Sequence, residues 1–165
     1  MILNKDLRLR IVDMVIKGKG GHIPSSFSIV DIINLIYSEF DVLEDKNGNQ
    51  PKNNFTLSKG HGACALYSVL NKYGIISDSD IDNYLNFNAI LGGHPDSTKV
   101  PGASASTGSL GHGLSFTLGR AMASKIKKNE TKYFVLVGDG ECHEGTIWEA
   151  ANIATNNKLN NLLNI

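Results

Sequence analysis

The stretch FVLVGDGECHEGTIWEAA, residues 134–151, places an aspartate between two glycines directly after an apolar run. Gly138 and Gly140 would let backbone amides approach an anion, and the carboxylate of Asp139 could hold a hard divalent cation such as Mg²⁺. Together these groups suit a magnesium-bound diphosphate. A plainer alternative is that Asp139 caps the following helix and that the glycines only form a turn.

Four of the five histidines are next to a glycine in the sequence; they are His22, His61, His94 and His112. Such positions are typical of loops, where polar groups converge on a ligand. A neutral imidazole there can donate to phosphate or hydroxyl oxygens or carry a proton. Any single one could be a solvated loop residue, but the shared context favours a common polar site.

Several other kinds of site fit the sequence poorly. No two histidines are spaced i,i+4, and Cys142 and His143 are adjacent, which points their side chains apart rather than into a tetrahedral zinc site. GDGECHEG lacks the G-x-G-x-x-G spacing of nicotinamide-binding folds, and neither a G-x-x-x-x-G-K-[ST] loop nor a G-x-S-x-G elbow is present.

The overall composition excludes further classes of function. Sixteen basic residues balance sixteen acidic ones, so no overall charge attracts nucleic acid or an anionic membrane. No apolar run approaches the ~20 residues that cross a bilayer. The two cysteines form no disulfide framework and the first residues do not resemble a signal sequence, which together predict a cytoplasmic protein.

Helical and strand patterns alternate along the chain. The helices and strands that they predict must position Asp139, its flanking glycines and the four histidines. Apolar residues at helical spacing predict helices over Leu3–Met14, Ile29–Phe40, Leu66–Tyr73, Ile81–Leu85, Leu110–Ile126 and Glu144–Asn157. Ser28 and Asp31 have the spacing of a capping box. Residues 44–54 are predicted to be a polar connector and residues 88–109 to be irregular. Small residues in the fifth helix, Gly113 and Gly119 among them, would allow close packing against a neighbour.

Strands are predicted over residues 55–57 and 133–137, and the second has no polar alternation, as in a strand buried on both faces of a parallel sheet. The sequence therefore predicts a three-layer α/β domain, with helices on both faces of a mainly parallel sheet. The run LNNLLNI (159–165) looks like the start of another strand. An α/β unit that stops there suggests a truncated or split protein.

Four segments closely resemble the diphosphate-binding domain of transketolases: LSKGHGACALY (57–67), GGHPD (92–96), PGASASTGSLGHGLSFTLGRAMA (101–123) and VGDGECHEGTIWEAANIA (137–154). The resemblance covers the chain from its first helix to its last residue and is nearest to two-chain forms, in which the N-terminal half is a separate subunit. It implies that residues 1–165 form a thiamine diphosphate-binding domain, incomplete at its C-terminal end and without the pyrimidine-binding domain. The implied activity is the transfer of a two-carbon ketol unit from a ketose phosphate to an aldose phosphate, dependent on thiamine diphosphate and Mg²⁺.

The resemblance assigns roles to individual residues. Asp139 matches the aspartate that binds the divalent cation of the cofactor, and Gly138 and Gly140 match the glycines beside it. His61 matches a histidine that contacts the diphosphate. His22 and His94 match histidines that line the substrate channel, contact sugar hydroxyls and assist proton transfer.

Gly108, Ser109 and Leu110 fall where a G-x-L segment meets the cofactor in the family. Glu144 matches a glutamate at the subunit interface, in a network that links paired active sites. Glu141 belongs to the same cofactor-binding stretch, and we expect it to be a solvated first-turn carboxylate that complements the helix dipole.

Some positions depart from the family or remain open. His112 replaces the glutamine of single-chain transketolases, and GHIPSS replaces the commoner G-H-P-G, which leaves the substrate preference open. Trp148 and Leu110 are expected to serve packing rather than chemistry, and Cys64 to pack inside its helix. Asp96 could equally be a turn residue or a ligand.

The resemblance also implies missing components. The asparagine that completes the metal site in the family falls beyond Ile165, and the glutamate that activates the aminopyrimidine belongs to the absent domain. We therefore expect this chain to be inactive alone and to form an oligomer with a separate C-terminal subunit. Two alternatives remain: a related thiamine diphosphate enzyme, such as a pentulose-phosphate synthase or a sugar-modifying ketolase, and a non-catalytic truncated remnant.

Overall fold

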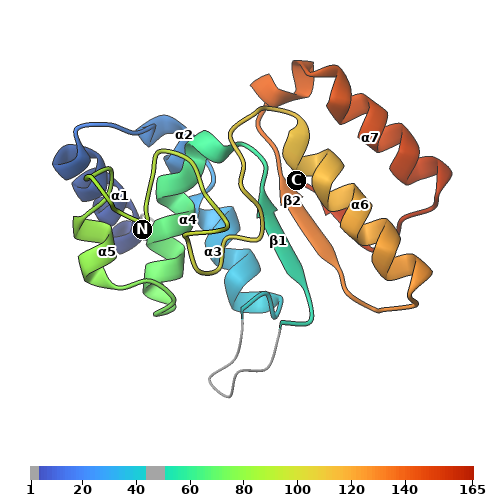
Figure 1. Ribbon diagram of the computed structural model, residues 1–165, viewed down its shortest axis with the longest axis horizontal. Helices are drawn as coiled ribbons and strands as arrows, with labels where there is room; N and C mark the ends of the chain where they lie inside the picture. The colour runs from blue at the N-terminus through green and yellow to red at the C-terminus, as the bar shows by residue number, and fades with distance from the viewer. Residues whose placement is uncertain (1–3, 44–50) are drawn as a thin grey trace. The chain divides into compact units, whose positions relative to one another are not determined.

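The computed structural model describes residues 4–43 and 51–165, so Leu3 and residues 44–50 of the predicted connector lie outside the described residues. The chain forms two compact units (Figure 1). Unit 1 consists of Met1–Glu39 and Gly60–Ser106, and unit 2 of Phe40–Lys59 and Thr107–Ile165.

Unit 1 is helical around a buried central helix. Its elements are α1 (Lys5–Gly18), α2 (Ile23–Phe27), α3 (Val30–Glu39), the 3-10 helix η1 (Gly60–Gly62), α4 (Ala63–Lys72) and α5 (Asp78–Asp82). Helix α4 is buried from Ala63 to Leu70, and α1, α2 and α3 pack against it. Cys64 is buried in this helix as predicted, and burial raises the pKa of its thiol.

The helices of unit 1 differ from the sequence patterns in two places. Helix α5 runs from Asp78 to Asp82, and Leu85 has a left-handed backbone (φ 60°), so the fourth helix begins and ends three residues earlier than its apolar spacing suggests. The patterns do not predict α2, which begins after His22 with Pro24 in its first turn. Proline is compatible with that position because its missing N–H would have no intrahelical partner there.

The side chains of the predicted capping box make other contacts as well. Ser28 is the C-cap of α2 and its hydroxyl donates to the carbonyl of Ser25. The carboxylate of Asp31, in the first turn of α3, accepts hydrogen bonds from the guanidinium of Arg8 at 2.6 and 3.0 Å. A complete capping box occurs at α5, where Ser77 and Asp80 bond reciprocally.

The Arg8–Asp31 ion pair predicts a pH-dependent contribution to stability. The hydrogen bond from Arg8 lowers the pKa of Asp31 below its ordinary value, so the stabilisation is present above about pH 4 and lost as the pH falls through the lower folded pKa. Because both side chains are partly exposed, we expect Asp31→Asn to reduce the free energy of unfolding by less than about 1 kcal/mol at pH 7. Urea denaturation at pH 7 and pH 2 would measure this, with Asp41→Asn as the control. An equal deficit at both pH values would contradict the assignment.

Unit 2 is a parallel sheet with helices packed on it (Figure 1). Its elements are β1 (Asn54–Leu57), α6 (His112–Ile126), β2 (Tyr133–Leu136), the 3-10 helix η2 (Gly140–His143), α7 (Gly145–Asn156) and β3 (Leu162–Asn164). The strand order is β1-β2-β3, with Thr56 opposite Val135 and Phe134 opposite Leu163. All four residues of β2 are buried, as predicted, and the α/β fold with a parallel sheet is confirmed. The run predicted to start a strand contains β3.

Helix α6 lies very close to β1 and packs against α7. A Cβ atom on Gly113 would lie 2.6 Å from the Cα atom of Ser58, so only glycine fits there. One turn later, the buried hydroxyls of Thr117 and Thr56 share a hydrogen bond of 2.9 Å, and the Thr117 hydroxyl also lies 2.8 Å from the Gly113 carbonyl. The prediction of close packing is therefore correct for Gly113, whereas a Cβ atom on Gly119 would meet open space.

Candidate functional site

The carboxyl ends of the parallel strands in unit 2 carry the aspartate that the sequence singled out. Strand β2 ends at Leu136, and Asp139 follows it with an exposed side chain. Asp139 makes no side-chain cap bond to η2, and the residue at the cap of α7 is Glu144. The capping alternative is therefore wrong, and the carboxylate is accessible to a cation.

The glycines on either side of Asp139 differ in their surroundings. Gly138 is buried, and a Cβ atom there would lie 3.2 Å from the Cδ atom of Lys59. Gly140 is exposed, and no atom lies within 4 Å of the position that its Cβ would take. The backbone beside Asp139 is thus open on the Gly140 side, where a ligand could approach.

Glu141 corrects a prediction. We expected a solvated carboxylate, but only 1% of Glu141 is exposed. Its Oε1 atom accepts hydrogen bonds from the Ser58 hydroxyl at 2.5 Å and from the Gly111 amide at 2.7 Å, and its Oε2 atom accepts one from the Gly138 amide at 3.1 Å. Burial of a charged group is tolerated when it is paired in this way.

Lys59 is a residue at this site that sequence reasoning missed. It lies between Ser58 and the start of unit 1, and only 7% of it is exposed. Burial lowers the pKa of its ammonium group, while the negative charges of Asp139 and Glu141 oppose that shift. The available signal was its place in LSKGHG, directly before the glycine and histidine of a recognised motif.

The predicted G-x-L segment lies in the same unit and is attached to the end of β1. The hydroxyl of Thr107 donates to the carbonyl of Leu57 at 2.7 Å. Gly108 has φ 143°, a conformation that favours glycine. Ser109 is exposed and Leu110 is half-buried. The segment thus begins at the carboxyl end of the sheet, as Asp139 does.

His112 makes local contacts at the start of α6. Its Nδ1 atom lies 3.0 Å from the Leu110 carbonyl oxygen and 3.2 Å from the Ser109 hydroxyl. These contacts give His112 a part in holding the G-x-L segment. They do not depend on a ligand.

The other three glycine-flanked histidines belong to unit 1. The rings of His22 and His61 lie edge to face, with centroids 5.6 Å apart. His22 and His94 are exposed, and His61 is half-buried. The structure therefore brings His22 and His61 together, and the common polar site of all four histidines stays a prediction.

Asp96 behaves as a turn residue. Its Oδ1 atom accepts hydrogen bonds from the amide and hydroxyl of Thr98 at 3.0 and 2.7 Å, and these bonds lower the pKa of the carboxyl. The Nζ atom of Lys99 lies 3.6 Å from the Oδ2 atom of Asp96. Of the two readings that the sequence left open, the structure favours the turn.

Glu144 and Trp148 are both exposed at the start of α7. Trp148 is 62% exposed, and its indole N–H donates to the Cys142 carbonyl at 2.9 Å, so the expectation that it serves packing rather than chemistry stays a prediction. Glu144 makes no side-chain bond to the helix that it caps. Its predicted place at a subunit interface remains a prediction.

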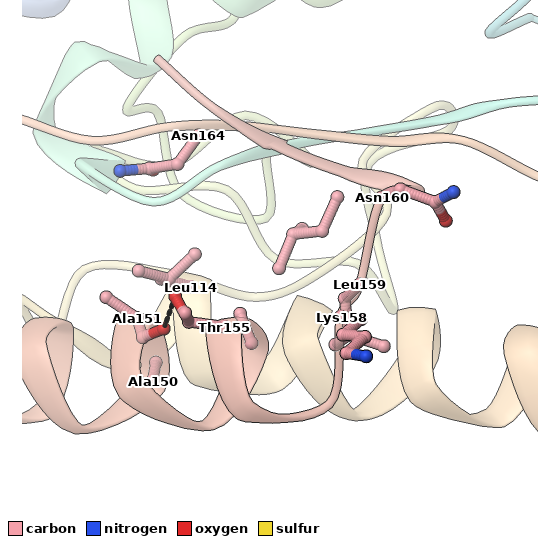
Figure 2. Close-up of a pocket in the computed structure, with 10 residues that line it drawn as sticks. Leu114, Ala150, Ala151, Thr155, Lys158, Leu159, Asn160 and Asn164 are labelled. Carbon is pink, nitrogen blue, oxygen red and sulfur yellow. Dashed lines mark hydrogen bonds between the residues drawn. The ribbon is translucent and has the colours of Figure 1, made fainter.

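Unit 2 also contains a cavity of about 530 Å³ whose lining includes none of the predicted site residues. It is lined by α6, α7, β3 and the turn between α7 and β3, including Ala151, Thr155 and Leu159 (Figure 2). The hydroxyl of Thr155 donates to the Ala151 carbonyl rather than into the cavity. Leu114 of α6, which was predicted only as a helix residue, is among the lining residues.

Residues 4–43 and 51–165 contain no group of three or more His, Cys, Asp or Glu side chains placed to hold a metal ion. Within the same ranges, no helix has the length and apolar character needed to cross a membrane. A cation at Asp139 would need further ligands other than the His, Cys, Asp and Glu side chains of these residues.

Comparison with known proteins gives a consistent result. The family described as "Transketolase, thiamine diphosphate binding domain" matches residues 2–165. The chain is 43% identical over 161 residues to one subunit of the apulose-4-phosphate transketolase of Phocaeicola vulgatus, covering 96% of this chain and 56% of that protein. It is 33% identical over 144 residues to the 6-deoxy-6-sulfo-D-fructose transketolase subunit SqwG of a Clostridium species, covering 87% of this chain and 52% of that one.

Among solved structures, transketolase from Campylobacter jejuni matches with a TM-score of 0.81 and 30% identity, covering 96% of this chain and 26% of that chain. The chain spans about half the length of the two curated relatives named above. Because the family match extends over nearly every residue, this chain belongs to the family of transketolase thiamine diphosphate-binding domains.

Proposed function

We propose that this chain is the N-terminal, cofactor-binding subunit of a two-chain transketolase, which transfers a two-carbon ketol unit together with a separate C-terminal subunit. The observation that carries the proposal is the exposed Asp139 carboxylate at the carboxyl end of β2, next to the open backbone at Gly140. In open parallel sheets ligands bind beyond this end of the strands. The family match supports the cofactor, and the relatives named as transketolase subunits support the partner.

The residues of unit 2 fit a magnesium-bound diphosphate. Asp139 would supply one oxygen ligand to Mg²⁺, whose other ligands would be diphosphate oxygens, water and groups outside the described residues. Lys59 adds positive charge near the same carboxylate. Gly108 and Gly140 would let the backbone approach the diphosphate closely.

Unit 1 would supply the groups that handle the sugar. We propose that His61 contacts the diphosphate and that His22 and His94 bind sugar hydroxyls and move protons. The edge-to-face pairing of His22 with His61 supports a shared task for these two rings. When bound, thiamine diphosphate would supply the nucleophilic carbon chemistry by which a ketose is cleaved.

The start of α7 exposes groups that suit a subunit interface. Glu144 and the large apolar surface of Trp148 are available at its first turns. Aromatic side chains are enriched in protein interfaces. We propose that this end of α7 lies in a subunit interface, with Glu144 in the network that links paired sites.

The sugar substrates are proposed only as a class. The names of the two relatives contain different sugars, apulose-4-phosphate and 6-deoxy-6-sulfo-D-fructose. Sugar phosphates of central carbohydrate metabolism are our first candidates. The free thiols of Cys64 and Cys142 are compatible with the reducing cytoplasm proposed for the enzyme.

A reconstitution experiment tests the proposal. The full-length chain is mixed with the pyrimidine-binding subunit of the same organism, thiamine diphosphate and Mg²⁺, and two-carbon transfer is assayed from a panel of ketose phosphates. We expect transfer only when both chains, the cofactor and Mg²⁺ are present. Transfer by this chain alone would contradict the proposal.

The same experiment separates the alternatives. Cofactor binding without transfer from any ketose phosphate would favour a related thiamine diphosphate enzyme with another donor. Absence of cofactor binding by the mixed chains would favour a non-catalytic remnant.

A further inference from the structure

The carboxylate of Glu141 connects three segments of unit 2 that are distant in the sequence. Ser58 follows β1, Gly138 follows β2, and Gly111 precedes α6. Their bonds to Glu141 span 83, 3 and 30 positions of the chain, respectively. The three donors reach the same buried side chain only because β1 and β2 are neighbouring parallel strands.

Each of the three donors is adjacent to a residue at the candidate cofactor site. Gly138 precedes Asp139, Gly111 follows Leu110, and Ser58 precedes Lys59. Glu141 itself points inward and is 1% exposed, whereas Asp139 is exposed. Glu141 can therefore affect a ligand only through the backbone that it holds.

The chemistry of this contact requires a carboxylate. Both oxygens of an ionised carboxylate accept hydrogen bonds, so Oε1 can serve Ser58 and Gly111 while Oε2 serves Gly138. A glutamine offers one accepting oxygen and an NH₂ group, which would face at least one donor. Buried donors that lose an acceptor cost free energy, so the loops would move apart or admit water.

We propose that Glu141 is a positioning residue, whose buried carboxylate holds the backbone of residues 108–111 and 138–140 in the arrangement that receives the diphosphate and its cation. This inference rests on the proposed function, because it concerns the same site. It replaces the expectation that Glu141 is a solvated carboxylate of the cofactor-binding stretch.

The test uses the full-length chain assembled with its pyrimidine-binding subunit. Glu141→Gln is compared with wild type and with Glu149→Gln, an exposed carboxylate of α7. Three quantities are measured: the Kd for thiamine diphosphate with Mg²⁺ by calorimetry, the amide hydrogen exchange of Gly111 and Gly138 in the cofactor-free complex, and kcat at saturating cofactor.

For Glu141→Gln we expect the Kd to rise by about 10- to 100-fold, the size typical when a group that orients a ligand's contacts is lost. Exchange at Gly111 and Gly138 should quicken, and kcat at saturating cofactor should stay within about threefold, because excess cofactor restores the loops. Glu149→Gln should match wild type in all three. If Glu141→Gln fails to fold, Ser58→Ala removes one donor and should raise the Kd by about threefold.

Three results would overturn the inference. One is a Kd for Glu141→Gln, or for Ser58→Ala in its place, equal to that of wild type. Another is a loss of kcat that saturating cofactor does not restore, since this would place Glu141 in the chemistry. A wild-type complex that binds no thiamine diphosphate would overturn the proposed function and this inference with it, whereas the first two results leave the proposed function standing.

Discussion

Asp139→Asn should abolish Mg²⁺-dependent binding of thiamine diphosphate, raising its Kd more than about a hundredfold, and two-carbon transfer should fall with it. The amide keeps the size of the side chain but removes the charge that Mg²⁺ prefers in its ligands. The neighbouring carboxylate of Glu141 cannot take over, because it is buried and bound to Ser58, Gly111 and Gly138. Calorimetric titration of the full-length chain with its partner subunit would measure the change.

Stability measurements separate a lost cation ligand from a damaged fold. Asp139 is exposed and its side chain makes no capping bond to η2, so Asp139→Asn should melt like wild type without cofactor. With cofactor at 100 times the wild-type Kd, wild type should gain about 2.7 kcal/mol and the variant less than half of that. Glu149→Gln should behave as wild type under both conditions. An Asp139→Asn enzyme that keeps full cofactor affinity would refute the assignment of the metal ligand.

Gly111→Ala should lower the free energy of unfolding by about 2–4 kcal/mol, since it combines overpacking with an unfavourable backbone conformation. Gly111 has φ 82°, which L side chains rarely adopt. Its Cβ atom would lie 2.2 Å from the Thr146 hydroxyl oxygen and 2.9 Å from the Cβ atom of Glu144, so α6 and the start of α7 would have to move apart. Urea denaturation of the full-length chain would measure the loss.

Gly119→Ala, inside the helix α6 that Gly111 caps, is the control. A Cβ atom there meets no atom within 4 Å, and alanine favours a helix interior over glycine by up to about 1 kcal/mol. We therefore expect Gly119→Ala to be neutral or stabilising. Equal effects of the two substitutions would show that the tight contact at Gly111 is not real.

The elements of this chain were largely predictable because their patterns are local. The apolar run at residues 133–137 indicated a strand buried on both faces, and β2 is buried throughout. Helical spacing located α1, α3, α4, α6 and α7. The five-residue helix α2 was not predicted, since so short a segment has no apolar period to detect.

The environment of the site residues was harder to predict because it depends on distant contacts. A glutamate directly after Gly-Asp-Gly has the local pattern of a solvated first-turn carboxylate. Its burial is set by Ser58, 83 positions earlier, and Gly111, 30 positions earlier. Lys59 was missed for the same reason, since its proximity to Asp139 arises from strand pairing rather than from spacing.

The threonine pair between β1 and α6 has a consequence for how enzymes of this kind can diversify. Thr56 and Thr117 are both buried, so a shift of the helix along the strand would separate two hydroxyls that no water can reach. Gly113 against Ser58 opposes the same sliding movement by steric contact. Because this contact leaves α6 little freedom to move along β1, we expect changes of sugar preference to accumulate instead in the surface loops around His22 and His94.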